Sequence, residues 1–165
     1  MNKNKFIGFF LIIFIYATPI ISADVRIQVK VNNKIITNID IDQERKYLTF
    51  LNPKLKDLTK EKSNEIAKNS LVTEIIKKEE LTKFVKFNQN SNLINIIEKN
   101  LIKKKNIKNK AELLEILKQR KLNYETIREK LYIEALWNQY IYNKYIKNVK
   151  IDKSKLRSSI LNQSK

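Results

Sequence analysis

The chain contains neither cysteine nor histidine. Disulfide bonds are therefore excluded, as are zinc sites built from cysteine and histidine and the Ser-His-Asp and Cys-His arrangements of nucleophilic catalysis. Acid–base chemistry by carboxylates alone stays open. The densest acidic cluster, Asp40, Asp42 and Glu44, falls in the first turn of a predicted helix, where capping and the helix dipole account for it. We expect no catalytic residue, no metal site and no cofactor.

Glycine and proline are almost absent. The only glycine is Gly8, and Pro53 is the only proline after residue 23. Glycine adopts positive φ without strain and lets a backbone approach a phosphate closely. Residues 24–165 therefore cannot form a glycine-dependent turn or phosphate loop, which removes many folds.

The first 23 residues have the organisation of a secretory signal peptide. Lys3 and Lys5 precede an apolar run over residues 6–16, and the segment ends at Ala23, a small residue. We expect cleavage after Ala23, with an uncleaved signal-anchor as the alternative. Residues 24–165 then suit a single exported domain, which must be held by packing alone because it has no disulfide.

Positive charge exceeds negative charge strongly. Lysine and arginine number 34 against 17 acidic residues, for a net charge of +17. Such a balance favours nucleic acid, anionic lipid or acidic protein partners. Export and the even spread of lysines weaken the nucleic-acid interpretation, so no nucleic acid is expected. The basic run Lys103–Lys105, followed by Lys108 and Lys110, suits either a helix C-terminus or an anionic docking patch.

A short hairpin is predicted at the start of the domain. Val25, Ile27, Val29 and Val31 alternate with polar residues, as in a half-buried strand. Asn32 and Asn33 suit a tight turn, and residues 34–37 form the returning strand.

Helices account for the rest of the pattern. Thr37 and Asp40 approximate a capping box, and Asn109 and Asn123 are further caps. The predicted helices run from Thr37 to about 50, from 59 or 63 to about 84, over 92–104, over 109–121 and over 124–148, the longest. A short strand near 149–151 and a last helix from Asp152 to Leu161 complete the prediction of a mainly α fold. Residues expected on inner faces include Ile76, Ile96 and Leu114.

Aromatic residues are concentrated in the last long helix. They are too many for one buried stripe: Tyr124, Tyr132, Trp137, Tyr140, Tyr142 and Tyr145. The helix carries either core residues with tyrosines at the core edge or a surface that accepts apolar segments of another chain. Tyr124, Tyr132 and Tyr142 are the candidate binding residues. Tyr132 and Tyr142 are expected to be exposed because they lie off the stripe formed by Ile127, Leu131 and Ala135.

Three stretches resemble the N-terminal domain of the SurA family of periplasmic chaperones. Residues 30–40 (KVNNKIITNID) are similar to its opening hairpin, and residues 122–128 (LNYETIR) to the entry of its last long helix. Residues 148–156 are similar to the exit toward its isomerase module. The resemblance covers nearly all of residues 24–165 and implies a helical cradle.

The resemblance implies a periplasmic holdase that binds unfolded outer-membrane proteins or their peptides and assists their assembly. The family usually continues into parvulin-type isomerase domains with a histidine-rich site. This sequence has neither the length nor the histidines for them, so we expect no enzyme activity and no small-molecule substrate. Two alternatives stay open: a non-catalytic envelope interaction subunit, and a basic binder of an anionic envelope polymer or nucleic acid.

Overall fold

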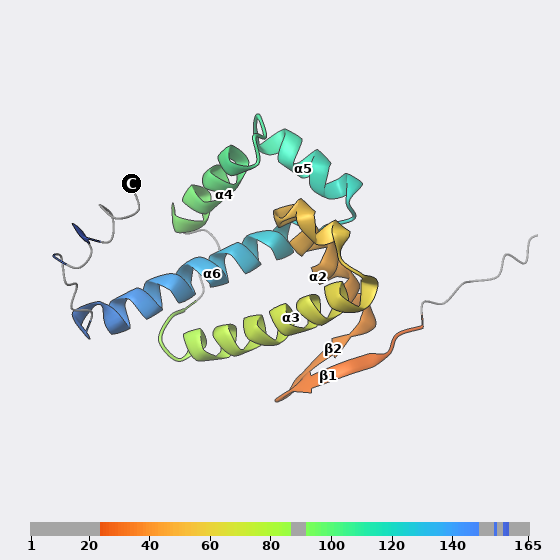
Figure 1. The fold of residues 1–165 in the computed structure, drawn as a ribbon, viewed down its shortest axis with the longest axis horizontal. Helices are drawn as coiled ribbons and strands as arrows, with labels where there is room; N and C mark the ends of the chain where they lie inside the picture. The colour runs from red at the N-terminus through yellow and green to blue at the C-terminus, as the bar shows by residue number, and fades with distance from the viewer. Residues whose placement is uncertain (1–23, 87–91, 149–153, 155–156, 159–165) are drawn as a thin grey trace, which may run out of the picture.

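The fold is mainly α with one N-terminal hairpin, as the sequence predicted. A computed structural model describes residues 24–86 and 92–148, with 154, 157 and 158 (Figure 1). The predicted signal peptide and the strand near 149–151 lie outside the described residues, as does the predicted helix from Asp152 except for residues 154, 157 and 158, which are helical. The elements are β1 Ile27–Val31, β2 Lys34–Thr37, α2 Asn38–Leu51, η2 Pro53–Asp57 (3-10), α3 Lys60–Thr82, α4 Asn92–Lys104, α5 Lys110–Gln119, α6 Tyr124–Tyr145 and η3 Ile146–Asn148 (3-10).

The hairpin is antiparallel and turns at Asn32, whose φ of 51° is a left-handed conformation that asparagine tolerates. One face of the hairpin is covered by α2 and α3, against which Val29 and Val31 of β1 are partly buried. Ile36 is buried against α2 and α3, whereas Val25 and Ile27 are exposed. The expected half-burial of the first strand is therefore wrong at its start, where the register shifts between Ile27 and Val29.

Helix α2 begins and ends where local chemistry dictates. The Thr37 side chain accepts from the Asp40 amide, and the Asp40 carboxylate accepts from the Thr37 amide, which completes the predicted capping box. Asn52 ends the helix before Pro53, as the restriction on residues preceding proline requires. Ile41 and Tyr47 are buried as predicted, and Phe50 is buried as well.

Helix α6 crosses the molecule with α3 on one side and α4 on the other (Figure 1). It contributes to two apolar clusters, one around Ile127 with α2, α4 and α5, and one around Ile133 with α3 and α4. With 22 residues it is one residue shorter than α3, so the prediction of the longest helix is wrong by that margin.

Three residues predicted to face inward are exposed instead. They are Ile76 on α3, Ile96 on α4 and Leu114 on α5. Each belongs to an apolar run wider than one helix face, and each helix meets its neighbours over part of that run. The apolar residues of these helices that do reach the core are Ala67, Leu81, Ile94, Leu101, Leu113 and Leu117.

Candidate functional site

The three predicted binding tyrosines do not form one site. Tyr124 lies at the first turn of α6 and is half-buried. Its hydroxyl donates to Glu98, and Lys110 lies 4.9 Å from the centre of its ring. Burial and the hydrogen bond to Glu98 raise the pKa of Tyr124. Tyr124 therefore links α4, α5 and α6 and is tied to its neighbours rather than presented to a ligand.

Tyr132 corrects the prediction. Its exposed fraction is 4%, and it belongs to the cluster of Leu81, Ile94, Ile133 and Leu136. The prediction placed Tyr132 off the stripe formed by Ile127, Leu131 and Ala135 and therefore expected it to be exposed. Because α6 is covered on two sides by α3 and α4, a second stripe containing Tyr132 is also internal. Tyr132 is a core residue.

Tyr142 is exposed as predicted, with 62% of its surface accessible. It lies in the C-terminal turns of α6, which extend past the ends of α3 and α4 in Figure 1. Phe84, 61% exposed, stacks on Tyr140 there with ring centres 5.2 Å apart, and Tyr145 and Ile146 are also exposed. We call Phe84, Tyr140, Tyr142, Tyr145 and Ile146 the aromatic end. Sequence reasoning missed Phe84, whose contact with α6 is set by tertiary structure.

Cations surround the aromatic end. The Lys144 ammonium lies 5.3 Å from the Tyr140 ring centre and 5.7 Å from that of Tyr145. It also donates to the Tyr140 hydroxyl at 3.2 Å, which raises the pKa of Lys144. Lys86 is exposed nearby in sequence, and Lys83 pairs with Glu80. The aromatic end is thus an apolar surface with a basic edge.

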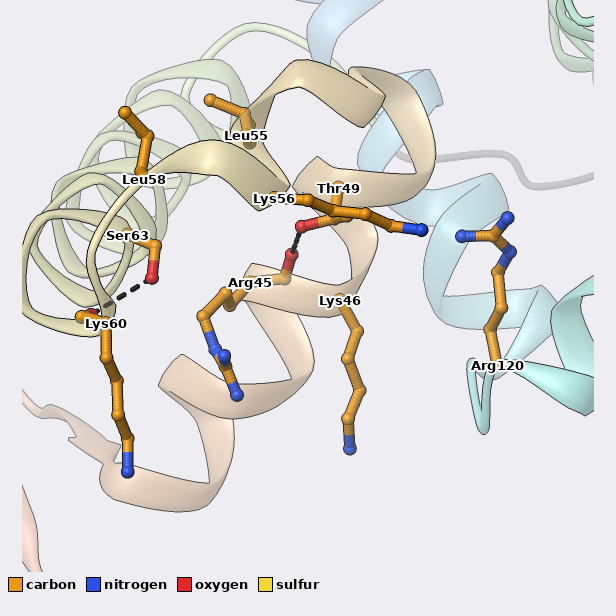
Figure 2. A pocket seen from close by; sticks show the side chains of 9 residues that line it. All are labelled: Arg45, Lys46, Thr49, Leu55, Lys56, Leu58, Lys60, Ser63 and Arg120. Atoms are coloured by element: carbon orange, nitrogen blue, oxygen red, sulfur yellow. Dashed lines mark hydrogen bonds between the residues drawn. The ribbon is translucent and has the colours of Figure 1, made fainter.

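A pocket lined with positive charge lies at the opposite end of the helical layer. It has a volume of about 430 Å³ and lies between α2, η2, the start of α3 and the residue that follows α5 (Figure 2). We call it the basic pocket. Five cations and four other residues line it: Arg45, Lys46, Lys56, Lys60 and Arg120, with Thr49, Leu55, Leu58 and Ser63.

The carboxylates near the basic pocket lie outside its lining. Asp42, one turn before the pocket on α2, pairs with Arg45 at 2.5 Å and with Lys46 at 2.6 Å. The hydrogen bonds from Lys46 and Arg45 hold the pKa of Asp42 below its usual range. Lys56, Lys60 and Arg120 pair with no carboxylate in the described part of the chain. Glu61 and Glu65 lie on the adjoining surface that Arg45 and Lys60 share with Asp42, but no carboxylate lines the basic pocket itself.

Positive charge is also concentrated behind this pocket. Two cations lie near the Phe50 ring, with the Lys105 ammonium 5.6 Å and the Arg120 guanidinium 5.7 Å from its centre. Lys105 donates to the Leu51 carbonyl. Burial, with repulsion from Lys104 and Arg120, lowers the pKa of Lys105. Of the predicted basic run, Lys105 adjoins the basic pocket, whereas Lys110 pairs with Glu98 at 3.5 Å.

Glu44 also departs from its predicted role at the helix start. Its side chain is 1% exposed, and it accepts from Ser70 at 2.7 Å and pairs with Lys130 at 2.9 Å. Lys130 also pairs with Glu74. This ionic cluster of Glu44, Glu74 and Lys130 joins α2, α3 and α6. Its carboxylates are occupied by these internal contacts, so we assign it a structural role.

No group of three acidic residues able to hold a metal occurs among the described residues. Nor does any helix in the ranges the structure covers reach the length and apolarity needed to cross a bilayer. Comparison with family models, with curated proteins and with solved structures finds no match to this chain.

Proposed function

We propose that this protein is a periplasmic holdase that binds unfolded outer-membrane proteins without nucleotide. The observation that carries the proposal is the aromatic end, where Phe84 stacks on Tyr140, and Tyr142, Tyr145 and Ile146 expose further apolar surface around the C-terminal turns of α6. The resemblance of residues 30–40 and 122–128 to the SurA N-terminal domain supports the same function.

The chemistry of the aromatic end suits an extended apolar segment. Aromatic side chains offer large contact areas, and apolar burial contributes about 25 cal/mol per Å² removed from water. Precursors of β-barrels expose alternating apolar residues until they fold, so such a segment can lie along this surface and leave again. Lys86 and Lys144 at its edge favour segments that also carry acidic residues.

Light scattering of a denatured β-barrel protein, diluted with and without the purified chain, tests the proposal. Protection should occur without nucleotide. Because apolar burial drives the contact, Tyr142→Ser/Tyr145→Ser should need about five times more protein for equal protection.

The matched control is Ile35→Ser/Leu114→Ser, which removes two exposed apolar residues away from the aromatic end. The amount of this variant needed for equal protection should stay within about twofold of that of the unaltered chain, because surface substitutions away from a binding site usually have small effects. Absence of protection at several-fold excess, from folded protein, would contradict the holdase. The aromatic end would then fit a fixed partner protein, which is the interaction-subunit alternative.

Salt separates the holdase from the second candidate, an anionic-polymer binder, which the basic pocket favours. Exposed charge interactions are screened strongly at about 0.5 M salt, whereas apolar burial is not weakened. Protection that survives high salt supports apolar binding.

A further inference from the structure

We propose that the basic pocket binds a phosphate-bearing ligand with at least two negative charges. The inference rests on the convergence of Arg45, Lys46, Lys56, Lys60 and Arg120 on one cavity, and it is independent of the aromatic end.

Four of the five cations lie within residues 45–60, and Arg120 comes from a distant part of the chain. Arg45 and Lys46 lie on α2, Lys56 on η2 and Lys60 at the first position of α3, while Arg120 caps the C-terminus of α5. In Figure 2 the side chains of Lys56 and Arg120 extend toward one another. Like charges brought together repel each other, and a bound anion removes that cost.

The balance of charge sets the charge of the ligand. Asp42 pairs with Arg45 and Lys46, and Glu61 and Glu65 lie outside the cavity near Arg45 and Lys60, but no acidic residue lines the basic pocket. A ligand with a single carboxylate would leave most of the positive charge of the basic pocket uncompensated. Two or more phosphate charges suit the remaining cations, because guanidinium groups bind phosphate oxygens in pairs and lysine binds them as a point charge.

The hydroxyl groups that line the basic pocket already donate to the backbone, so the cations are the groups that would bind a ligand. Thr49 donates its hydroxyl to the Arg45 carbonyl at 2.7 Å, and Ser63 donates to the Lys60 carbonyl at 3.0 Å. Leu55 and Leu58 are half-buried and exclude part of the water, which strengthens charge interactions in the cavity. A volume of about 430 Å³ suits a small ligand.

One further feature points to an anion. Helix α3, capped by Thr59, begins at the basic pocket, and its N-terminal dipole adds positive potential.

Isothermal titration calorimetry of the purified chain with pyrophosphate tests the site. One pyrophosphate should bind per chain. Lys56→Gln/Arg120→Gln should weaken binding about tenfold or more, because it removes two charge-assisted contacts. Lys60→Gln, which changes one exposed residue at the helix start, should weaken it about threefold to tenfold.

The control Lys54→Gln/Lys118→Gln removes equal charge from the same two segments but from residues that do not line the basic pocket. Its affinity should stay within about twofold of the unaltered chain. Circular dichroism establishes that each variant is folded. Undetectable pyrophosphate binding, or equal weakening in the pocket and control variants, would overturn the proposal, because the charge would then act diffusely.

The phosphate can belong to a soluble compound or to a lipid headgroup. Co-sedimentation with phosphatidylcholine vesicles that contain phosphatidic acid separates these sources. Loss of vesicle binding in the pocket variant alone supports the site with a headgroup ligand. Equal vesicle binding by the pocket and control variants, with pyrophosphate binding lost in the pocket variant, supports the site with a soluble ligand.

Discussion

Lys130 is the cation shared by two buried or half-buried carboxylates, Glu44 and Glu74. Its side chain is 11% exposed and pairs with both. Burial opposes the charge of Lys130, but the attraction of Glu74 and Glu44 outweighs it and raises the pKa of Lys130. Burial also raises the pKa of Glu74, although Lys130 opposes that shift. The three charges therefore depend on one another, as in other buried ion pairs.

We predict that Lys130→Met lowers the free energy of unfolding by about 3–5 kcal/mol, because Glu44 is left buried without its counter-charge. Lys118→Met, at an exposed position without an ion pair, is the control and should change it by less than about 0.5 kcal/mol. Urea denaturation at pH 7 measures both. A loss below about 1 kcal/mol for Lys130→Met would show that the pair contributes little.

The same ionic cluster predicts how stability changes at high pH. A lysine whose pKa is raised by folding contributes stability that is present below its unfolded pKa of about 10.4 and is lost as pH rises through the folded value. Burial, with the charges of Glu44, Glu74 and Glu134, raises the pKa of Tyr47 and acts in the same direction. Urea midpoints should therefore fall above about pH 10, and the fall should be smaller in Lys130→Met.

At the scale of elements, two helices are each followed by a residue other than glycine in the left-handed conformation. After α4 the left-handed residue is Asn106, and after α5 it is Lys121, with φ of 53° and 56°. The next amides close back on the helix, from Ile107 to the Ile102 carbonyl and from Leu122 to the Leu117 carbonyl. These are Schellman bonds, and both following residues are buried in the cluster around Ile127.

Lys121→Gly should raise the free energy of unfolding by about 0.5–1 kcal/mol, because glycine adopts positive φ without strain. Lys118→Gly, within α5, is the matched control and should lower it by about 1 kcal/mol. Thermal and urea denaturation of the two variants compare them directly. If both substitutions lowered the free energy of unfolding, the contacts of the Lys121 side chain would stabilise the fold by more than the strain of its positive φ costs.

At the scale of the whole molecule, α6 separates the two proposed surfaces. The aromatic end lies at its C-terminal turns, whereas the basic pocket is built on α2, η2, α3 and α5 near its N-terminal end (Figure 1). A helix of 22 residues is about 33 Å long, several times the Debye length of about 8 Å at physiological salt. The two surfaces should therefore act independently.

We predict that each of the two pairs of substitutions impairs one activity and leaves the other unchanged. Tyr142→Ser/Tyr145→Ser should reduce protection of the denatured β-barrel protein and leave pyrophosphate affinity within about twofold, since distant sites are additive. Lys56→Gln/Arg120→Gln should do the reverse. Scattering and calorimetry on the same preparations measure both. If either pair impairs both activities in folded protein, the surfaces are coupled.

Prediction from sequence succeeded where the interaction is local. Thr37, Asn109 and Asn123 each cap a helix through a bond that spans three residues, so their pattern is visible in the chain itself. The turn at Asn32 is local in the same way. The burial of Tyr132 and the exposure of Ile76 were predicted wrongly. When a helix has apolar residues on more than one face, its sequence alone does not show which face packs against a neighbouring helix.

The sequence by itself determined the mainly α fold, the hairpin and the helix boundaries, because caps and periodicity act over a few residues. Only the tertiary structure decided which charges meet. Arg45 and Arg120 are far apart in sequence and line one cavity, while Glu44 is buried against Lys130 and Phe84 stacks on Tyr140. These contacts follow from the packing of helices that are distant in sequence, which no local pattern encodes. Both candidate surfaces are consequences of that packing.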